Sequence, residues 1–363
     1  MGTAARVVIL PKDTATLRVE DLSLPDPAPT QVVVKQFASG ICHSQLHQMH
    51  RPRKHPIILG HEATGVVSKA GSKVTHVKEG DIVLLTWVPR NAAAAEELPV
   101  RSTLEVSDGI AQSENVFTWA DNTIADQQYV VKVDPNIKKD VTAIIGCAVM
   151  TGAGAVINTA NVQPGQSVAI FGVGGVGISA VVGARMAGAN PIIAVDLDDS
   201  KLEFAVQFGA THTINATQED PIAAIHALTG VNEKFTFLRT QVSGVDFAFD
   251  CIGVRQTMEQ IVPACKTGQF GVAKGGLGVL VGVPSTAVEL NAIDMLLNEK
   301  GFIGSFGGSC APDRDFPRFL EWEERGELNL DAMITQRFTI DQINEATSAL
   351  AAGEINGRAI LEF

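Results

Sequence analysis

Two cysteines and one histidine of the types that bind zinc lie in glycine-containing segments of the sequence. Cys42 lies in GICHSQLHQMH, His61 in GHEATG and Cys147 in IIGCAVMTGAG. Two thiolates and one imidazole, with a fourth position left for water or substrate, are the ligand set of an open catalytic zinc site. The long intervals between these residues match no short metal motif. From spacing alone, two buried free cysteines and a histidine in a turn therefore remain the alternative.

A glycine-rich turn indicates that the chain binds a dinucleotide. Gly172, Gly174 and Gly177 form a G-x-G-x-x-G between the apolar run SVAIF and the helical pattern GISAVVGARMAG. We expect the first glycine to permit a tight turn, the second to let the backbone approach a pyrophosphate, and the third to pack the helix on the strand. Gly175 and Val176 would open that helix, whose free N–H groups would face the phosphates.

An aspartate after the next apolar run favours NAD over NADP. Asp196 ends the run PIIAVD, about 20 residues beyond the glycine turn. A carboxylate at this place accepts hydrogen bonds from the adenosine ribose hydroxyls and repels a 2′-phosphate. Asp198 and Asp199 add further negative charge. The alternative is an aspartate that only caps a turn at the strand end.

The order of strand and helix patterns predicts an α/β chain with two domains. Short apolar strands separated by Gly and Pro occupy the first 150 residues, followed by alternating strands and helices, which imply a doubly wound parallel sheet. We expect a β-rich domain over 1–148, completed by 306–363, and a dinucleotide-binding domain over 149–305. The expected strands and helices of the second domain are 167–171, 174–188, 192–195, 201–208, 247–250, 258–265 and 279–283.

Composition excludes several classes of protein. The 363 residues carry a formal net charge of −12, which disfavours binding to nucleic acid because phosphates would be repelled. We find no apolar run long enough to span a membrane and no secretory leader at the N-terminus. The five cysteines are scattered without a CxxC pair, which favours reduced thiols over disulfides. A cytoplasmic protein is therefore expected.

Five motifs in order give the chain a family resemblance. GICHS, LGHEATGVV, the Gly80-Asp81 turn, GCAVMTGAGA and GVGGVG resemble the zinc-containing alcohol dehydrogenases of the medium-chain dehydrogenase/reductase superfamily, near the thiol-dependent formaldehyde and the aryl and primary alcohol dehydrogenases. The resemblance covers nearly the whole chain. It implies a GroES-like β-rich catalytic domain and a Rossmann domain. It also implies that Cys42, His61 and Cys147 bind one catalytic zinc, with Glu62 as an alternating ligand or a neighbouring charge.

The same resemblance assigns roles to residues around the metal and the cofactor. It implies that Ser44 hydrogen-bonds the zinc-bound alcohol and passes its proton, through the cofactor ribose, to His47. A solvated loop histidine is the alternative for His47. His43 and Arg358 match positions that contact the cofactor pyrophosphate, and Lys201 matches a position near the adenosine ribose.

The sequence departs from the family pattern at two places. Gln45 stands where the family usually has an aspartate that hydrogen-bonds the zinc-ligand histidine. Because an amide adds no charge to that histidine, we predict a more electrophilic and more weakly held zinc. Residues 89–118 contain no cysteine, so the four-cysteine structural zinc lobe of many relatives cannot form. We expect a long loop there, with one helical turn at 92–97.

Aromatic residues indicate an apolar or aromatic substrate. Trp87, Phe117, Trp119 and Phe306 lie in segments that line the substrate cleft of relatives, and ordinary core packing is the equal alternative. The basic stretch 50–55 is either a solvated loop or a patch that steers an anionic substrate.

These residues together predict an NAD-dependent zinc alcohol dehydrogenase acting on a small molecule, as a homo-oligomer, either a dimer or a tetramer. One alternative is a zinc-free reductase of an activated C=C bond from the same superfamily. Another is a non-catalytic nucleotide-binding protein on the same scaffold. The Cys–His–Cys set argues against the first alternative, and the Ser44/His47 pair argues against the second, because binding alone needs no proton path.

Overall fold

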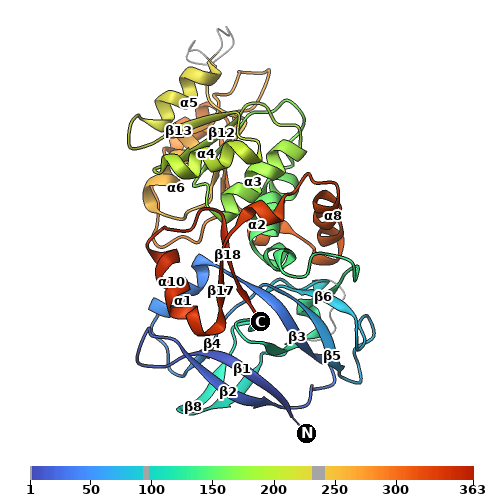
Figure 1. Ribbon diagram of the computed structural model, residues 1–363. Helices are drawn as coiled ribbons and strands as arrows, with labels where there is room; N and C mark the ends of the chain where they lie inside the picture. Colours follow the sequence, from blue (N-terminus) through green and yellow to red (C-terminus); the bar gives the residue numbers. More distant parts are fainter. Residues whose placement is uncertain (1, 93–97, 231–241) are drawn as a thin grey trace. The chain divides into compact units, whose positions relative to one another are not determined.

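The computed structural model describes residues 2–92, 98–230 and 242–363 and divides into two compact units (Figure 1). The first unit comprises Met1–Ala148 and Ala311–Phe363, and the second comprises Val149–Cys310. The C-terminal segment thus returns to the unit in which the chain begins. None of the described helices is both long and apolar enough to cross a membrane.

The larger sheet of the first unit is organised around the long strand β3. The N-terminal half of β3 pairs with β9, its C-terminal half pairs with β18, and β5 runs along its other side. Two register shifts between β3 and β5 bend the strand, as bulges do. In order across the sheet the strands are β10 (Val130–Lys132), β6 (Ile82–Leu85), β5 (Ala63–Ala70), β3 (Gln31–Ile41), β18 (Arg358–Glu362) and β17 (Ile334–Thr339), with β9 (Asn122–Asp126) on β3.

The second sheet of this unit contains a hairpin that corrects a sequence prediction. We expected a long loop over 89–118, but β7 and β8 pair there as an antiparallel hairpin, and Leu104 and Ala111 are buried in a hydrophobic cluster. Apolar packing therefore holds the segment that a structural zinc holds in many relatives. The predicted helical turn at 92–97 falls largely on 93–97, outside the described residues. The strand order is β2 (Arg18–Leu24), β1 (Thr3–Leu10), β4 (Ile57–Ile58), β8 (Gly109–Gln112) and β7 (Thr103–Val106).

Short helices cover the sheets of the first unit. The longest, α8, begins with Pro312 at its first turn and buries Phe316, Phe319 and Trp322 along one side. Lys138 forms ion pairs with Glu323 and Asp331, which tie α8 and α9 to the loop before Cys147. The elements are α1 (His43–His50), η2 (Gln127–Tyr129), η3 (Val141–Gly146), α8 (Pro312–Glu324), α9 (Leu330–Met333), η6 (Ile340–Gln342) and α10 (Ile343–Ala351).

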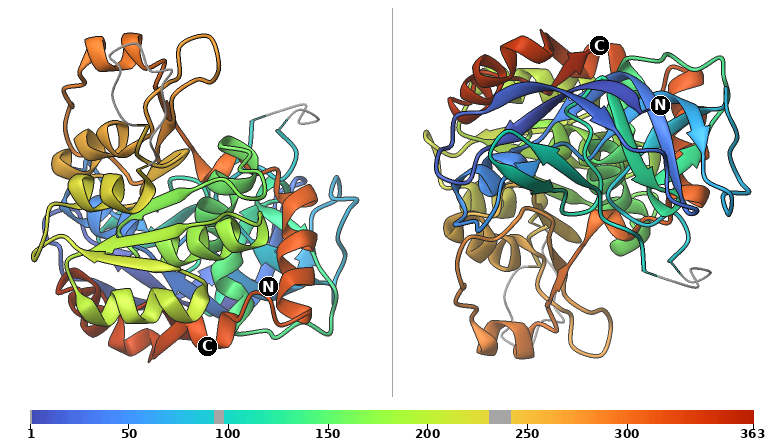
Figure 2. Two further views of the ribbon diagram at one scale, coloured as in Figure 1. Left: turned by 90° about the horizontal axis from the view of Figure 1, so that it is seen from above. Right: turned by 90° about the horizontal axis from the view of Figure 1, so that it is seen from below.

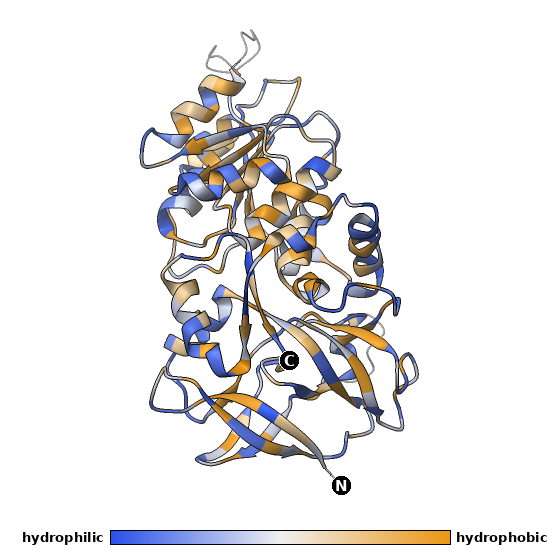
Figure 3. Ribbon diagram, viewed as in Figure 1, coloured by the Kyte–Doolittle hydropathy of each residue, from blue (hydrophilic) through white to orange (hydrophobic). Residues whose placement is uncertain are grey.

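The second unit is a doubly wound parallel sheet, as predicted. Helices α3 and α4 pack together over β11, β12 and β13, while α5 and α6 pack together over β13, β14 and β15 (Figure 2, left). Hydrophobic residues run along α3 and the strands behind it (Figure 3). The strand order is β13 (His212–Asn215), β12 (Ile192–Asp196), β11 (Val168–Phe171), β14 (Phe247–Asp250), β15 (Leu277–Leu280) and β16 (Gly301–Gly304). The helices are α2 (Ala148–Gly154), η4 (Ala155–Thr159), α3 (Gly175–Met186), α4 (Asp199–Phe208), α5 (Pro221–Thr229), α6 (Arg255–Ala264), α7 (Ala292–Leu297) and η5 (Gly307–Ser309).

Sequence patterns locate some strands of this unit at the right residues and displace others. The strand predicted at 247–250 coincides with β14, whereas the strand predicted at 279–283 lies at Leu277–Leu280. The last strand prediction is displaced because Gly278 interrupts the apolar run at the centre of β15. Strands β13 and β16 and helices α5 and α7 were not predicted.

The basic stretch 50–55 contains one arginine with a structural role. Arg53 donates to the backbone oxygens of Pro11 at 2.7 Å and Met49 at 2.9 Å, and also to the oxygens of Thr14 and Arg51. Its guanidinium therefore joins the C-terminal end of α1 to the loop after β1. Lys54, by contrast, is exposed. The stretch is neither a wholly solvated loop nor a patch of three free charges.

We predict that Arg53→Ala lowers the free energy of unfolding by about 1–3 kcal/mol, because several backbone oxygens lose a charged donor. Lys54→Ala is the matched control and should change it by less than about 0.5 kcal/mol. Chemical denaturation of both variants measures the difference. Equal effects of the two substitutions would contradict the structural role of Arg53.

Candidate active site

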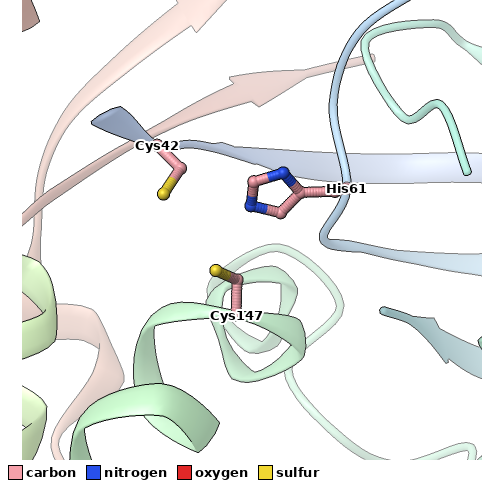
Figure 4. A group of neighbouring side chains, drawn as sticks. All are labelled: Cys42, His61 and Cys147. Atoms are coloured by element: carbon pink, nitrogen blue, oxygen red, sulfur yellow. The ribbon is translucent and has the colours of Figure 1, made fainter. Parts of the chain in front are cut away.

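Three side chains far apart in the sequence converge in the first unit. Cys42, His61 and Cys147 each offer one ligand atom, and these atoms lie within 4.8 Å of one another. The two thiols and the imidazole point toward a common centre (Figure 4). Both cysteines are buried and unoxidised. Sequence spacing left open whether these residues meet, and the fold brings them together.

Each ligand follows a different element of the backbone. Cys42 comes directly after β3 and caps the N-terminal end of α1. His61 follows Gly60, whose φ of +91° lies in a region that disfavours other residues. Cys147 ends η3, and the Thr86 hydroxyl donates to the backbone oxygen of Gly146 at 2.8 Å, next to this ligand.

The two nitrogens of His61 have different surroundings. Nδ1 contacts the side-chain amide of Gln45. Nε2 is buried and has no hydrogen-bond partner within the described parts of the chain. A buried ring nitrogen without a partner carries a free-energy cost that a cation at the centre of the cluster would remove. The donor set of two sulfurs and one nitrogen is that of a catalytic zinc site, so these residues fit the metal.

The charges around the cluster favour a thiolate at Cys42. A hydrogen bond from the Cys147 thiol lowers the pKa of Cys42 well below its ordinary value, and the Arg358 guanidinium acts in the same direction. The pKa of Cys147 is raised, first because its proton is held in this hydrogen bond and then because it is buried. The surroundings thus favour the thiolate at Cys42 over the thiolate at Cys147, and a bound cation would favour ionisation of both.

Glu62 and Arg358 form a buried ion pair beside the cluster. Arg358 donates to Oε1 of Glu62, and the backbone N–H of Ala148 donates to Oε2 at 3.2 Å. Burial raises the pKa of Glu62, and Arg358 opposes that shift. A Cβ atom at Gly40 would lie 2.3 Å from this carboxylate, so the site requires glycine there.

Sequence reasoning placed Arg358 at a pyrophosphate and missed its pairing with Glu62. The sequence did carry a signal for this pairing. Arg358 stands at the start of an apolar C-terminal strand, and a buried cation requires an anion nearby. Contact of Arg358 and of the exposed His43 with a dinucleotide stays a prediction.

Helix α1 presents the two residues of the expected proton path. Ser44 and His47 lie three positions apart and therefore on one side of the helix. The Ser44 hydroxyl oxygen is buried, and none of the described residues hydrogen-bonds to it. His47 is exposed. One end of the pair is thus positioned for a ligand and the other for exchange with water.

The glycine turn of the second unit has the geometry of a phosphate-binding turn. Gly172 has φ of +84°, and a Cβ atom at Gly177 would lie 1.9 Å from its carbonyl oxygen. A Cβ atom at Gly174 would meet nothing within 4 Å, so this is the open side of the turn. Gly175 and Val176 begin α3 directly after it. The first N–H groups of a helix have no partner within it and can bind an anion.

Asp196 is oriented by the backbone at the end of β12. Its carboxylate accepts the N–H of Val173 at 2.9 Å and the N–H of Leu197 at 2.7 Å. This places a negative charge beside the glycine turn. Lys201 lies in the first turns of α4, half-buried.

Two of the four predicted substrate-pocket residues are core residues. Phe117 and Trp119 are fully buried in two different hydrophobic clusters, which agrees with the core-packing alternative for these two residues. Trp87 is half-buried, and its ring meets that of His61 edge-on at 6.3 Å between centroids. Phe306 is 83% exposed in the second unit. Trp87 is the predicted lining residue that the structure brings to the metal cluster.

Comparison with known proteins agrees with these two units. Residues 28–135 match the family model of the alcohol dehydrogenase GroES-like domain, and 175–325 match that of zinc-binding dehydrogenase. The chain is 30% identical to alcohol dehydrogenase class-3 of Cereibacter sphaeroides, over 93% of this chain and 94% of the relative. It is 31% identical to S-(hydroxymethyl)glutathione dehydrogenase of Paracoccus denitrificans, with the same coverage.

A solved structure shows the same architecture. Benzyl alcohol dehydrogenase from Acinetobacter calcoaceticus superposes with a TM-score of 0.86 at 27% identity, covering 99% of each chain. The family resemblance, the fold class and the alcohol dehydrogenase activity expected from the sequence are thereby confirmed.

Gln45 contacts two groups that would both be hydrogen-bond donors when His61 binds a metal. Its side-chain oxygen accepts the Cys42 N–H at 3.1 Å, and its nitrogen contacts His61 Nδ1. A neutral imidazole that binds metal through Nε2 carries its proton on Nδ1, so both neighbours of Gln45 would then be donors. A carboxylate can accept from both, whereas an amide has a single acceptor oxygen. One of the two hydrogen bonds is therefore lost when the metal binds.

We predict that Gln45→Glu, which keeps the side-chain length, tightens zinc retention about tenfold by accepting from both donors. Competition with a chelator measures the dissociation constant. Gln163→Glu adds the same charge on an exposed loop of the second unit and should leave the constant unchanged. An unchanged constant in Gln45→Glu would show that the missing acceptor does not weaken the metal site.

Proposed function

This chain belongs to the zinc-containing alcohol dehydrogenases of the medium-chain superfamily, and on that premise we propose that it is an NAD-dependent enzyme whose zinc ion is held by Cys42, His61 and Cys147. It interconverts an alcohol and its aldehyde or ketone. The observation that carries the proposal is the convergence of the three ligand atoms around a buried His61 nitrogen without a partner. When bound, the metal lowers the pKa of an alcohol hydroxyl and polarises a carbonyl group.

Ser44 and His47 supply the route for the proton. The Ser44 oxygen, which is buried and has no hydrogen-bond partner among the described residues, would accept a hydrogen bond from the substrate hydroxyl and take up its proton while the serine's own hydroxyl proton passes on toward His47. His47, exposed one helical turn later on the same side of α1, would exchange that proton with water. A protein that only bound nucleotide would need neither residue.

Glu62 and Arg358 keep the metal pocket ordered without entering the reaction. Their ion pair is buried, and Glu62 also accepts the Ala148 N–H beside Cys147. In this arrangement Glu62 contributes a negative charge next to the cluster. A zinc-free reductase of C=C bonds has no use for a Cys–His–Cys set next to such a carboxylate.

Asp196 selects NAD. Its carboxylate, held by two backbone N–H groups beside the glycine turn, offers acceptor oxygens to the adenosine ribose and repels a phosphate at the 2′ position. Lys201 lies within reach of the same sugar in this proposal.

The substrate is a small alcohol with an apolar or aromatic body. Trp87 beside His61 supplies an aromatic wall next to the metal cluster. One relative is named for a glutathione adduct, an anionic molecule, and this makes an anionic tail the second candidate. Arg53 is occupied by backbone oxygens and Arg51 forms an ion pair with Glu114, which leaves the exposed Lys54 to attract such a tail.

A second copy of the chain is the expected protein partner. Strand β16 lies at one edge of the parallel sheet, and Ile303 on it is partly exposed. A sheet edge with apolar residues favours pairing with another chain. We therefore infer a homo-oligomer.

We predict one zinc per chain and NADH formation with apolar or aromatic alcohols. Cys147→Ala should remove both the zinc and the activity, because a site with two protein ligands holds zinc weakly. Cys251→Ser changes a cysteine outside the cluster and should retain both. Elemental analysis and an NADH assay over an alcohol panel measure these outcomes. Folded, NAD-binding protein without zinc would instead favour the C=C reductase.

We predict that Asp196→Ser lowers the preference for NAD over NADP by about 10- to 100-fold, because a charged acceptor and its repulsion of the 2′-phosphate are lost. The ratio of kcat/KM for the two cofactors measures the change. Glu203→Gln removes a charge from the exposed side of α4 and should leave the ratio intact. An unchanged ratio in Asp196→Ser would exclude this residue as the selector.

A further inference from the structure

Residues Thr118 and Trp119, here called the 118–119 clamp, contact the backbone next to two of the three metal ligands. The backbone N–H groups of both residues donate to the carbonyl oxygen of Leu59, each at 3.0 Å. Leu59 lies two positions before His61. The clamp therefore holds the turn that presents the imidazole, through two hydrogen bonds to one oxygen.

The Thr118 hydroxyl extends the clamp to the residue after His61. Its oxygen lies 2.8 Å from the Ser39 hydroxyl and 3.3 Å from the backbone oxygen of Glu62. Ser39 donates its single hydroxyl proton to that Glu62 oxygen at 2.9 Å, so the Thr118 hydroxyl donates to Ser39 and reaches Glu62 through it. All three residues are fully buried, so water cannot replace these bonds. The hydroxyl thus joins strand β3 to the His61 turn.

The Trp119 indole reaches the segment that carries Cys42. Its Nε1–H donates to the backbone oxygen of Gly40 at 3.1 Å, two positions before Cys42. The ring shares one hydrophobic cluster with Ile41 and Leu59. The Trp119 side chain therefore hydrogen-bonds the backbone just before Cys42 and shares a hydrophobic cluster with Leu59, just before His61.

Gly60 shows how closely the clamp fits against the His61 turn. A Cβ atom at this position would lie 2.4 Å from the Trp119 backbone nitrogen and 2.5 Å from Thr118 Oγ1. The turn has no room to shift toward the clamp. The two backbone hydrogen bonds to Leu59 and the chain of hydrogen bonds from Thr118 through Ser39 to Glu62 oppose a shift away from it.

Cys147 is held by different groups. Thr86 bonds the Gly146 oxygen, and a Cβ atom at Gly146 would lie 2.2 Å from the Leu85 oxygen on β6. The clamp therefore acts on the positions of Cys42 and His61 relative to each other, while β6 fixes the third ligand.

We propose that Thr118 and Trp119 are positioning residues that set the Cys42–His61 geometry for the metal. The inference rests on the proposed zinc function, and it gives Trp119 a role different from the substrate-lining role expected from the sequence. The clamp touches neither ligand side chain by hydrogen bond. It acts through the Leu59, Gly40 and Glu62 backbone oxygens.

Thr118→Val and Trp119→Phe test the clamp, since each removes one hydrogen-bonding group and keeps most of the buried volume. Thr118→Ser keeps the hydroxyl and should behave as the wild type. Phe117→Leu reduces a neighbouring buried ring that belongs to another cluster. For each chain we would measure Zn²⁺ affinity by chelator competition, the visible spectrum of the Co²⁺-substituted protein, and the unfolding free energy of the metal-free protein.

Thr118→Val and Trp119→Phe should weaken Zn²⁺ binding about 10- to 100-fold and shift the cobalt bands, whereas Thr118→Ser and Phe117→Leu should do neither. If the Zn²⁺ affinity and the cobalt spectrum change only in proportion to the loss of unfolding free energy, and change equally in Phe117→Leu, the positioning role of the clamp is contradicted. A wild-type chain that binds neither Zn²⁺ nor Co²⁺ would contradict the metal proposal itself and the clamp with it. Failure of the clamp alone would leave wild-type binding intact.

Discussion

The buried carboxylate of Glu62 is the constraint on which the first unit depends. Its two oxygens accept from Arg358, at the start of the last strand, and from the backbone beside Cys147. Because an unpaired buried charge is very costly, the C-terminal segment must return to this unit to bring Arg358 to the carboxylate. Pairing of β18 with β3 then places the return strand against the strand that leads into Cys42. One ion pair thus couples the discontinuous chain path to the metal cluster.

The charges of this region balance when a divalent cation is present. Two thiolates and Glu62 contribute three negative charges, and Arg358 with a divalent cation contributes three positive charges. The neutral amide of Gln45 preserves this balance, whereas an aspartate would add a negative charge to a buried site. However, the amide supports a metal-bound His61 with a weaker hydrogen bond than a carboxylate would form. The chain therefore combines a balanced pocket with a ligand histidine that is incompletely supported, which favours a more electrophilic metal.

Sequence patterns predict the central strands of the second unit, such as Phe247–Asp250, because each is a short apolar run followed by a helix, but they miss the less buried edge strands β13 and β16. They could not bring Cys42, His61 and Cys147 together, since these ligands meet only through tertiary strand pairing, and the family resemblance was needed. The hairpin within 89–118 was missed because each of its strands buries a single residue, Leu104 or Ala111, so that neither strand is an apolar run. The apolar ring of a tryptophan suits both a hydrophobic core and the wall of a pocket. The sequence alone could therefore not assign Trp119 to the core.

X-ray absorption at the zinc edge of the metal-loaded protein tests the central claim most directly, because it reports the atoms bound to the ion. The account predicts two sulfur ligands at about 2.3 Å and at least one imidazole nitrogen at about 2.0 Å. A spectrum with only nitrogen and oxygen neighbours would contradict it, since the two cysteines would then not hold the metal.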